Sequence, residues 1–341
     1  MSKVFITGGT GCIGASAIHK LLTQYESEVE TIIIVSRTGD PKLLKIWLGD
    51  TVDEFVASGK LQFVSVDIGD AAALEAALQE HQPNRIMHLG ALQSPDCDSM
   101  PEKGVEINVT GTLNLFSAVE KLETKVDRFV FASSAAVYGK RAMYPESIVG
   151  ENAALAPPNY YGVWKVAGEH LAALFHGRSG IPTVSLRLNT TFGPGRDRGK
   201  TSAPTVALKS IALGSHNGET TPYRMPYQGR ENYHYVEDVG AHFAGVCMMP
   251  FEGCEAFNIR GKTIPVAEFL ETSATVAGSL GMQHVDVGIE DDASPNLFIC
   301  DLDDEKVAAA FPGLPKTPIE EGIRKSLEMF QQHANDGLLE L

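Results

Sequence analysis

A tyrosine and a lysine one helical turn apart are the residues of this chain that point most clearly to chemistry. Tyr161 and Lys165 lie four positions apart in a helix predicted over 160–176, so their side chains project from the same face. A phenol has an ordinary pKa of about 10, and a neighbouring cation favours its ionised form. The spacing therefore predicts that Tyr161 is a general acid or base on a substrate hydroxyl or carbonyl, with Lys165 beside it.

Two serines stand where a partner for this tyrosine is expected. Ser133 and Ser134 follow a strand predicted over 128–132. The carboxyl ends of parallel strands carry the ligand site in open α/β sheets, and a hydroxyl there can hydrogen-bond a reacting oxygen and orient it. Capping of the strand end is the structural alternative for both serines.

Three glycines form a second candidate site. They stand between an apolar strand predicted over 4–7 and a helix predicted over 13–25. Glycine permits a tight turn, and its missing Cβ lets the backbone approach a pyrophosphate. The following helix offers unpaired N–H groups and a partial positive charge to the same anion. We therefore expect a dinucleotide to be bound by Gly8, Gly11, Cys12, Ile13 and Gly14.

The end of the second predicted strand, over 31–35, bears on which nicotinamide cofactor is bound. An acidic residue there would bind the ribose 2′-hydroxyl of NAD, whereas this chain has Ser36 and Arg37. A small polar residue and an arginine suit a 2′-phosphate, because arginine offers charge-assisted bidentate contacts. The sequence therefore favours NADP over NAD, with a solvated loop arginine as the structural alternative.

Strands and helices alternate through the first half of the chain. Strands that are apolar on both faces belong to parallel sheets covered by helices, and such alternation implies right-handed βαβ units. The predicted fold is a doubly wound parallel α/β sheet (Rossmann-like) with a smaller mixed α/β substrate lobe. The dinucleotide-binding domain is expected over 1–191 with a return over 231–259, and the lobe mainly over 192–230 and 260–341. Strands are predicted over 4–7, 31–35, 61–66, 85–89, 128–132, 181–188 and 256–259, with helices over 13–25, 41–59, 71–80, 105–122, 160–176 and 236–249.

These motifs together resemble one known family. Thr7-Gly8-x-x-Gly11-x-x-Gly14, Ser133-Ser134-Ala135-x-Val137-Tyr138-Gly139 and Tyr161-x-x-x-Lys165 are similar to signatures of the extended short-chain dehydrogenase/reductase family, of NAD-dependent epimerase/dehydratase type. The resemblance extends from Lys3 to about Phe330. It implies an enzyme in which Ser134 is the catalytic hydroxyl, with Ser133 as the alternative.

The same resemblance implies further roles. Asp67 and Ile68 resemble the pair that contacts adenine, although Asp67 can instead simply cap the following helix. Asn108 resembles the helix asparagine that organises a water and the active-site lysine. The remaining implied contacts are those of Leu89, Gly90 and Ala91 with the cofactor, of Lys165 with the nicotinamide ribose, and of Ser134, Thr190 and Arg230 with the substrate.

Departures from the family pattern bear on the reaction. Dehydratases of this family carry Thr-Asp-Glu where this chain has Ser134-Ala135-Ala136. Loss of water needs that additional acid and base, so we expect no dehydration. Nucleotide-sugar enzymes usually have asparagine at the position of Thr190, which weakens the case for a nucleotide-linked sugar, although Asn189 or Arg230 can compensate. The basic run over 196–200 either meets an anionic substrate or forms a solvated loop.

Bulk composition argues against several other partners. The formal net charge is −15, and such a surface repels polyanions, so no nucleic acid is expected. The five cysteines lack zinc-knuckle spacing and the ten histidines form no ligand cluster, so we expect no metal and free thiols in a reducing cytoplasm. No basic leader precedes the first strand and no apolar run is long enough to cross a bilayer, so no membrane association is expected.

The expected function is NAD(P)-dependent hydride transfer at a secondary alcohol or ketone of a sugar-like or polyhydroxy small-molecule substrate. An epimerase would retain its cofactor and a dehydrogenase would exchange it, and the sequence leaves both open. A non-catalytic NAD(P)-binding sensor is the alternative, against which intact Ser134, Tyr161 and Lys165 argue. A homodimer is expected through the helices over 105–122 and 160–176, because the family often pairs there.

Overall fold

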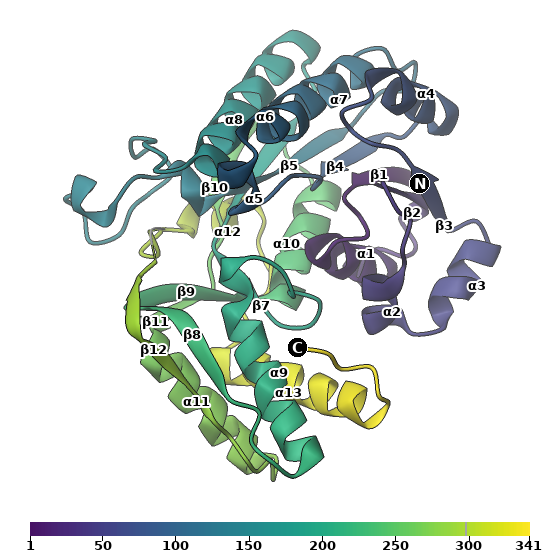
Figure 1. Cartoon of the computed structure of the whole chain (residues 1–341). Helices are drawn as coiled ribbons and strands as arrows, with labels where there is room; N and C mark the ends of the chain where they lie inside the picture. Colours follow the sequence, from purple (N-terminus) through teal and green to yellow (C-terminus); the bar gives the residue numbers. More distant parts are fainter. Residues whose placement is uncertain (297–298) are drawn as a thin grey trace.

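The computed structural model describes residues 1–296 and 299–341 and has a seven-stranded parallel sheet at its centre (Figure 1). The strand order is β10-β6-β5-β4-β1-β2-β3, and all neighbours pair in parallel. The apolar residues 32–35 are all buried, as expected for a strand covered on both faces. The strands are β1 (Ser2–Thr7), β2 (Val29–Ser36), β3 (Leu61–Ser65), β4 (Arg85–His88), β5 (Arg128–Ser134), β6 (Thr183–Leu188) and β10 (Cys254–Asn258).

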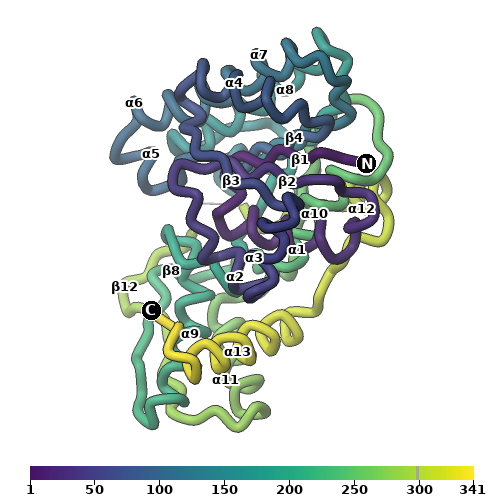
Figure 2. The backbone as a smooth tube through the Cα atoms, turned by 90° about the vertical axis from the view of Figure 1, so that its right-hand side faces the viewer, coloured from purple at the N-terminus to yellow at the C-terminus, as the bar shows by residue number. Residues whose placement is uncertain are grey.

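Helices cover both faces of this sheet. Helices α4 (Ala71–His81), α7 (Gly111–Val119) and α8 (Tyr160–Ser179) lie on one face, and α1 (Cys12–Gln24) and α10 (Val236–Met248) lie on the other (Figures 1 and 2). The predicted doubly wound fold is therefore confirmed. The strand order reverses between β1 and β4, so a ligand crevice is expected at the carboxyl ends of these two strands.

Two helical regions differ in detail from their prediction. The helix predicted over 105–122 begins as a π-helical segment and only then becomes α7. The segment predicted over 41–59 forms two helices, because Gly49 between them adopts a φ of 55°. The short elements are α2 (Lys42–Leu48), α3 (Thr51–Ala57), α5 (Asp96–Ser99), α6 (Pro101–Gly104), the π-helical Val105–Thr110, and 3₁₀ turns at Ala135–Val137, Arg141–Met143 and Lys200–Ser202.

The second half of the chain builds a smaller lobe, below the sheet in Figure 1. A three-stranded β11-β9-β7 sheet and a two-stranded β12-β8 sheet share a core in which Phe192, Tyr233 and Phe269 pack their rings together. Helices α9, α11 and α13 cover this core. The bounds are β7 (Thr190–Phe192), β8 (Tyr223–Gln228), β9 (Arg230–Tyr235), β11 (Lys262–Pro265), β12 (Val287–Pro295), α9 (Ala203–Asn217), α11 (Val266–Ser279), α13 (Ile319–Asn335) and, beside β10, α12 (Glu305–Ala310).

The return of the chain to the main sheet begins later than predicted. Strand β9 pairs within the three-stranded sheet, whereas α10 and β10 belong to the seven-stranded sheet region, so 231–235 lies on the lobe side. The assignment of the two regions to cofactor and substrate binding stays a prediction. Within residues 1–296 and 299–341, no helix is long and apolar enough to span a membrane, no three metal-ligating side chains converge, and the five cysteines are unpaired.

Candidate active site

Helix α8 brings two candidate residues to the carboxyl end of β5. The Asn159 carboxamide caps the helix by accepting a hydrogen bond from the Gly162 N–H at 2.9 Å. A Cβ at Gly162 would lie 2.2 Å from the Ala136 carbonyl oxygen, so glycine is required for this close approach. Tyr161 and Lys165 are therefore held against the segment that follows β5.

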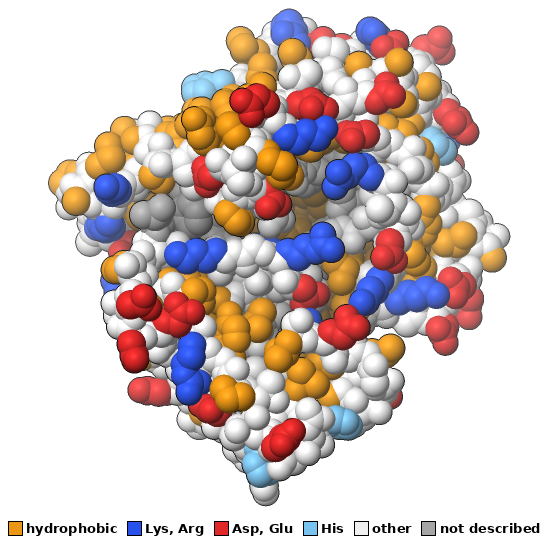
Figure 3. Space-filling model, viewed as in Figure 1, with side chains coloured by type: hydrophobic (Ala, Val, Ile, Leu, Met, Phe, Trp, Pro, Cys, Tyr) orange, Lys and Arg blue, Asp and Glu red, His pale blue; other side chains and the backbone are white. Residues whose placement is uncertain are grey.

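One cavity of about 280 Å³ collects most of the predicted site residues. Its lining comes from loops of the main sheet and from the lobe, and its volume is near the lower end for ligand pockets. Figure 3 shows the molecule hollowed between its upper and lower halves, with Lys and Arg side chains at the rim. The predicted residues in the lining are Gly8, Gly11, Cys12, Ile13, Gly14, Leu89, Ala91, Ser134, Tyr161, Lys165 and Thr190.

Lys165 is buried beside the tyrosine ring. Its Nζ donates a hydrogen bond to the Ala132 carbonyl oxygen at 2.6 Å and lies 5.5 Å from the centre of the Tyr161 ring. Burial lowers the pKa of Lys165 to about 8, and the charges of Cys97 and Glu169 oppose this shift. The amine is therefore a cation at neutral pH that loses its charge slightly above it.

Burial moves the pKa of Tyr161 in the direction opposite to the one predicted from its neighbour. It raises the pKa to about 12, while a hydrogen bond with Ser134 and the charge of Arg196 lower the pKa only in part. Lys165 is not among the groups that lower it. The lowering by Lys165 together with a bound nicotinamide ring stays a prediction for the complex with cofactor.

The two serines have different partners. Ser134 hydrogen-bonds Tyr161, and its Oγ also accepts from the Ala136 N–H at 3.1 Å. Ser134 therefore caps the segment after β5 and contacts Tyr161 at the same time. The Ser133 hydroxyl donates to the Glu169 carboxylate. This geometry favours Ser134 over Ser133 as the hydroxyl that meets a substrate oxygen.

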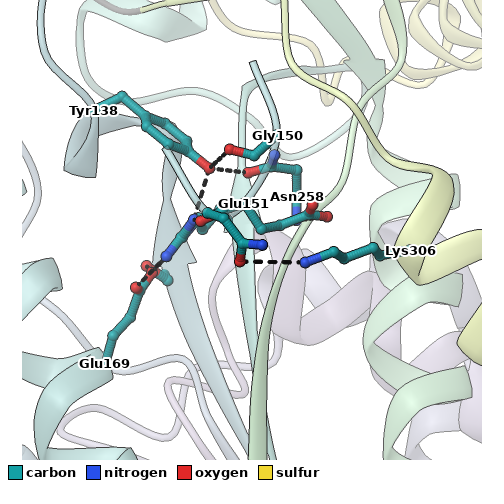
Figure 4. Close-up of polar contacts among 9 residues, drawn as sticks. Tyr138, Gly150, Glu151, Glu169, Asn258 and Lys306 are labelled. Atoms are coloured by element: carbon teal, nitrogen blue, oxygen red, sulfur yellow. Dashed lines mark hydrogen bonds and ion pairs between the residues drawn. The ribbon is translucent and has the colours of Figure 1, made fainter. Parts of the chain in front are cut away.

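A buried ion pair joins α8 to the central strands. Glu169, one turn after Lys165, accepts two hydrogen bonds from Arg187 of β6 at 2.8 and 2.7 Å. Arg187 also donates to the Tyr138 hydroxyl at 2.6 Å, and this hydroxyl donates to the Asn258 side-chain oxygen at 2.8 Å (Figure 4). One polar network therefore connects α8 with β6 and β10.

The glycine loop fits a dinucleotide pyrophosphate. Gly8 has a φ of 70°, and a Cβ there would lie 2.8 Å from the Gly90 nitrogen. A Cβ at Gly14 would lie 2.6 Å from the Cα of Gly9. Gly11 is the N-cap residue of α1 and provides no side-chain cap, so the first N–H groups of the helix remain to bind an anion. The loop thus combines close backbone approach with unpaired donors.

The residues predicted for the adenosine end lie outside the cavity lining. The Asp67 carboxylate accepts from the N–H two residues further on at 2.9 Å, whereas Asp70 caps α4, so helix capping by Asp67 is wrong. Ile68 is buried. Ser36 Oγ accepts from the N–H three residues further on at 2.9 Å, and Arg37 is exposed, with no side-chain partner in the part of the chain that the structure describes.

Three further predicted residues, Gly90, Asn108 and Arg230, do not line the cavity. The Asn108 carboxamide accepts from the Leu92 N–H at 2.7 Å and donates to the Leu92 carbonyl at 2.8 Å, so it holds the loop after β4. The Arg230 side chain is 58% exposed and pairs with Asp301 at 3.3 Å. The roles of Asn108 and Arg230 toward lysine and substrate stay predictions.

Polar residues that the sequence did not single out lie in or behind the cavity wall. Glu231 is 1% exposed, and burial raises its pKa to about 7. It hydrogen-bonds Thr190 and Asn296, which both line the cavity. Gln93 and Ser94, after β4, line it as well. No motif marks these residues, because long-range pairing of β7 with β9 is what brings Glu231 behind the cavity wall.

A larger hollow, of about 840 Å³, lies at the opposite end of the strands, where β4 and β5 begin. Arg85 and Arg128, the first residues of β4 and β5, belong to its lining. Arg128 donates to the Val246 carbonyl at 2.9 Å, and Arg85 donates to the Cys247 carbonyl, so both arginines stabilise the carboxyl end of α10. Ligands of open α/β sheets bind at the carboxyl ends of the strands. The smaller cavity, which lies at those ends, is therefore the candidate active site.

The fold and this site together define an α/β enzyme of the nicotinamide dinucleotide-binding class. The family model for GDP-mannose 4,6 dehydratase matches residues 5–301. The chain therefore belongs to the extended short-chain dehydrogenase/reductase family, of the NAD-dependent epimerase/dehydratase type that its motifs indicate.

Relatives within this family cover nearly the whole chain. A dTDP-glucose 4,6-dehydratase of Shigella flexneri is 24% identical, over 98% of this chain and 94% of that protein. A D-erythronate dehydrogenase of Haemophilus influenzae is 24% identical, over 83% of this chain and 85% of that protein. The crystal structure of Thermus thermophilus UDP-glucose 4-epimerase with NAD has a TM-score of 0.73 at 25% identity, over 96% of this chain and 99% of that one.

Proposed function

We propose that this chain transfers hydride at a secondary alcohol or ketone of a sugar-like or other polyhydroxy substrate. The observation that carries the proposal is that Ser134, Tyr161 and Lys165 line one cavity with the glycine loop. The names of the relatives support the substrate class, because dTDP-glucose, UDP-glucose and D-erythronate are all polyhydroxy compounds.

Each of the three residues has a separate task. Tyr161, as the phenolate that Lys165 and a bound nicotinamide ring would favour, would take the proton of the substrate hydroxyl during oxidation, and Ser134 hydrogen-bonds the same oxygen and orients it. Lys165 holds a positive charge beside the tyrosine and binds the nicotinamide ribose. A nicotinamide ring, when bound, would supply the hydride acceptor. In a dehydrogenase the ketone then leaves. In an epimerase the ketone would instead rotate within the site. Hydride would then return to its opposite face, and Tyr161 would return the proton to its oxygen.

Dehydration is not part of the proposal, although the family model carries a dehydratase description. Ala135 and Ala136 occupy the positions of the additional acid and base, and both are buried apolar residues. The one carboxylate in the described lining is Asp98, which accepts from the Ser94 hydroxyl and the Tyr160 N–H, each at 3.3 Å. Loss of water needs an acid and a base that this lining does not provide.

The test replaces the tyrosine oxygen alone. Tyr161→Phe should lower turnover by about 10²- to 10⁴-fold, the usual contribution of a general acid or base. The dissociation constant of the cofactor should stay within about twofold, because the glycine loop is unchanged. Tyr160→Phe is the matched control, since Tyr160 is exposed and stacks on Trp164. Unaltered turnover in Tyr161→Phe would favour the non-catalytic sensor instead.

We propose NADP as the preferred cofactor. The unpartnered, exposed Arg37 beside Ser36 supports this choice, because a free guanidinium suits a 2′-phosphate. Arg37→Ala should weaken NADPH binding about tenfold or more and leave NADH binding unchanged, as measured by fluorescence titration of each. Equal losses for both cofactors, or tighter binding of NADH by the unmodified protein, would contradict the preference.

We also propose a homodimer, located in the cytoplasm. Leu113 on α7 and Val163 and Leu174 on α8 are exposed apolar side chains on neighbouring helices, and pairing of two copies would remove them from water. The unpaired thiols suit a reducing compartment. Sedimentation equilibrium of the unmodified protein and of Leu174→Glu should show a dimer and a monomer respectively, whereas two monomers would refute the pairing.

A further inference from the structure

We propose that the substrate is a small polyhydroxy carboxylate, whose carboxylate is bound by Arg196 and Lys200 and whose hydroxyls are bound by Asn189. This assignment rests on the proposed hydride-transfer function and narrows its substrate class. All three residues line the cavity that contains Tyr161 and Ser134. The sequence leaves the basic run over 196–200 between a substrate contact and a solvated loop. Two of its residues, Arg196 and Lys200, lie at the active site.

Arg196 is fixed over the cavity by the loop that carries it. Three of its N–H groups donate hydrogen bonds, to Gln93 Oε1 at 3.3 Å, to Thr201 Oγ1 at 2.7 Å and to the Arg198 carbonyl. A guanidinium has five N–H groups, so two remain without a partner within the described part of the chain. Two N–H groups match the two oxygens of a carboxylate, which arginine binds in a planar, bidentate manner.

The charge of the lining also selects an anion. The lining contains the cations Lys165, Arg196 and Lys200 but a single carboxylate, Asp98, in a chain whose formal net charge is −15. The charge of Arg196 lowers the pKa of both Tyr161 and Cys12, each against a larger increase caused by burial. Its electrostatic field therefore reaches the tyrosine as well as the glycine loop, so an anion bound there lies next to the reacting atoms.

Asn189 has a hydrogen-bonding capacity that the protein itself does not use. Both atoms of its carboxamide are buried, and neither has a partner among residues 1–296 and 299–341. Buried polar groups are nearly always paired. Asn189 lines the cavity between Leu188 and Thr190, so its unpaired amide is suited to bind a ligand there. An amide both donates and accepts, which matches the hydroxyl groups of a polyhydroxy chain.

The size of the cavity favours a small substrate. The cavity measures about 280 Å³, and its lining includes the glycine loop as well as Tyr161, so it must also admit the nicotinamide end of the cofactor. Ligand pockets usually measure about 300 to 1,000 Å³. The remaining space suits an acid of four to six carbons rather than a sugar joined to a nucleoside diphosphate. Oxidation moves hydride from the carbinol carbon to the nicotinamide and the hydroxyl proton to Tyr161, and the carboxylate is unchanged.

The test compares four probe classes with the cofactor-loaded enzyme. These are four- to six-carbon aldonic acids, polyols of the same length, sugar phosphates and UDP-glucose. Turnover is followed by cofactor absorbance and by chromatography of stereoisomers, and binding is followed by calorimetry with Tyr161→Phe, which permits binding without turnover. Aldonic acids should bind and react, and Arg196→Gln and Lys200→Gln should each raise their KM and dissociation constant by about tenfold to a hundredfold. Arg198→Gln is the control, because its side chain is exposed and outside the lining.

Several outcomes would overturn the assignment without affecting the proposed function. These are tighter binding of polyols, sugar phosphates or UDP-glucose than of aldonic acids, or a loss of cofactor affinity in Arg196→Gln that leaves acid binding intact. Absence of aldonic-acid binding by calorimetry would overturn it as well. Unaltered turnover of any substrate in Tyr161→Phe would instead defeat the hydride-transfer proposal, so the two failures are distinguishable.

Discussion

Glu231→Gln should abolish a large part of the pH dependence of stability between about pH 4.5 and 7. Glu231 is 1% exposed, and burial raises its pKa from 4.5 to about 7. Because the folded pKa lies above the unfolded one, the folded protein binds more protons than the unfolded chain within this window. The contribution of Glu231 to stability is therefore complete below the unfolded pKa and is lost as the pH rises through the folded pKa.

The magnitude follows from the difference between the two pKa values. One pKa unit corresponds to about 1.4 kcal/mol, so the rise from 4.5 to about 7 makes the carboxylate about 3 kcal/mol less favourable in the folded protein than in the unfolded chain. Denaturant unfolding at a series of pH values would give the free energy of unfolding of both proteins. The difference between wild type and Glu231→Gln should fall by about 3 kcal/mol as the pH increases across the window.

Glu237→Gln is the control of opposite sign. Burial raises the pKa of Glu237, but the hydrogen bond and charge of Lys20 and the charge of Lys325 outweigh burial and lower the pKa overall. Its contribution is present above the unfolded pKa and is lost as the pH falls through the folded pKa.

The refuting result concerns the difference in free energy of unfolding between wild type and Glu231→Gln. If this difference is flat or increases with pH, the reasoning is wrong, because Glu231 would then be ionised at no cost inside the lobe.

Two further substitutions test the glycine loop and the buried ion pair. Gly8→Ala should weaken cofactor binding at least tenfold in titration, because the new Cβ would press on Gly90 at 2.8 Å. Gly218→Ala, with a φ of 74° and open space around it in the lobe, should leave binding intact, and equal affinities of the two variants would refute the close-approach argument. Glu169→Gln should destabilise the protein by about 3 kcal/mol in denaturant unfolding, because it leaves the arginine of β6 buried with a neutral partner. It should also move the alkaline limb of kcat/KM to lower pH, since the Glu169 charge raises the pKa of Lys165, and an unmoved limb would show that this charge does not act on the lysine.

The main sheet could be predicted because each of its strands can be recognised from the hydrophobic pattern of its own residues. The run over 32–35 is apolar at consecutive positions, and only a strand covered on both faces places all of these residues inside. The pairing of Tyr161 with Lys165 could be predicted for the same reason, since the helical repeat alone brings residues four apart to one face. The glycine loop follows from the strict steric limits at Gly8 and Gly14.

The lobe side of the cavity could be predicted only in part, as Thr190, Asn189 and the run over 196–200, because its contacts form between residues far apart in the sequence. Glu231 meets Thr190 through the pairing of β7 with β9, and Arg196 meets Gln93 across a separation of 103 residues. The contribution of Asn189 depends on what its neighbours fail to offer, and no local pattern shows a missing partner. For the tyrosine pKa, burial has the largest effect in this cavity, and the lowering by Lys165 together with a bound nicotinamide ring stays a prediction.

Helix α8 couples the chemistry to the fold through a single face. Tyr161, Lys165 and Glu169 are spaced by four residues, so the helical repeat stacks them in one row. The row begins in the cavity, continues with an amine held by the Ala132 carbonyl and ends in a bidentate pair with Arg187. A change at Glu169 therefore acts on the lysine in two ways, through its charge and through the position of the helix. The pH profile reports the charge, and the dissociation constant of the cofactor reports the position, so the two effects can be measured separately.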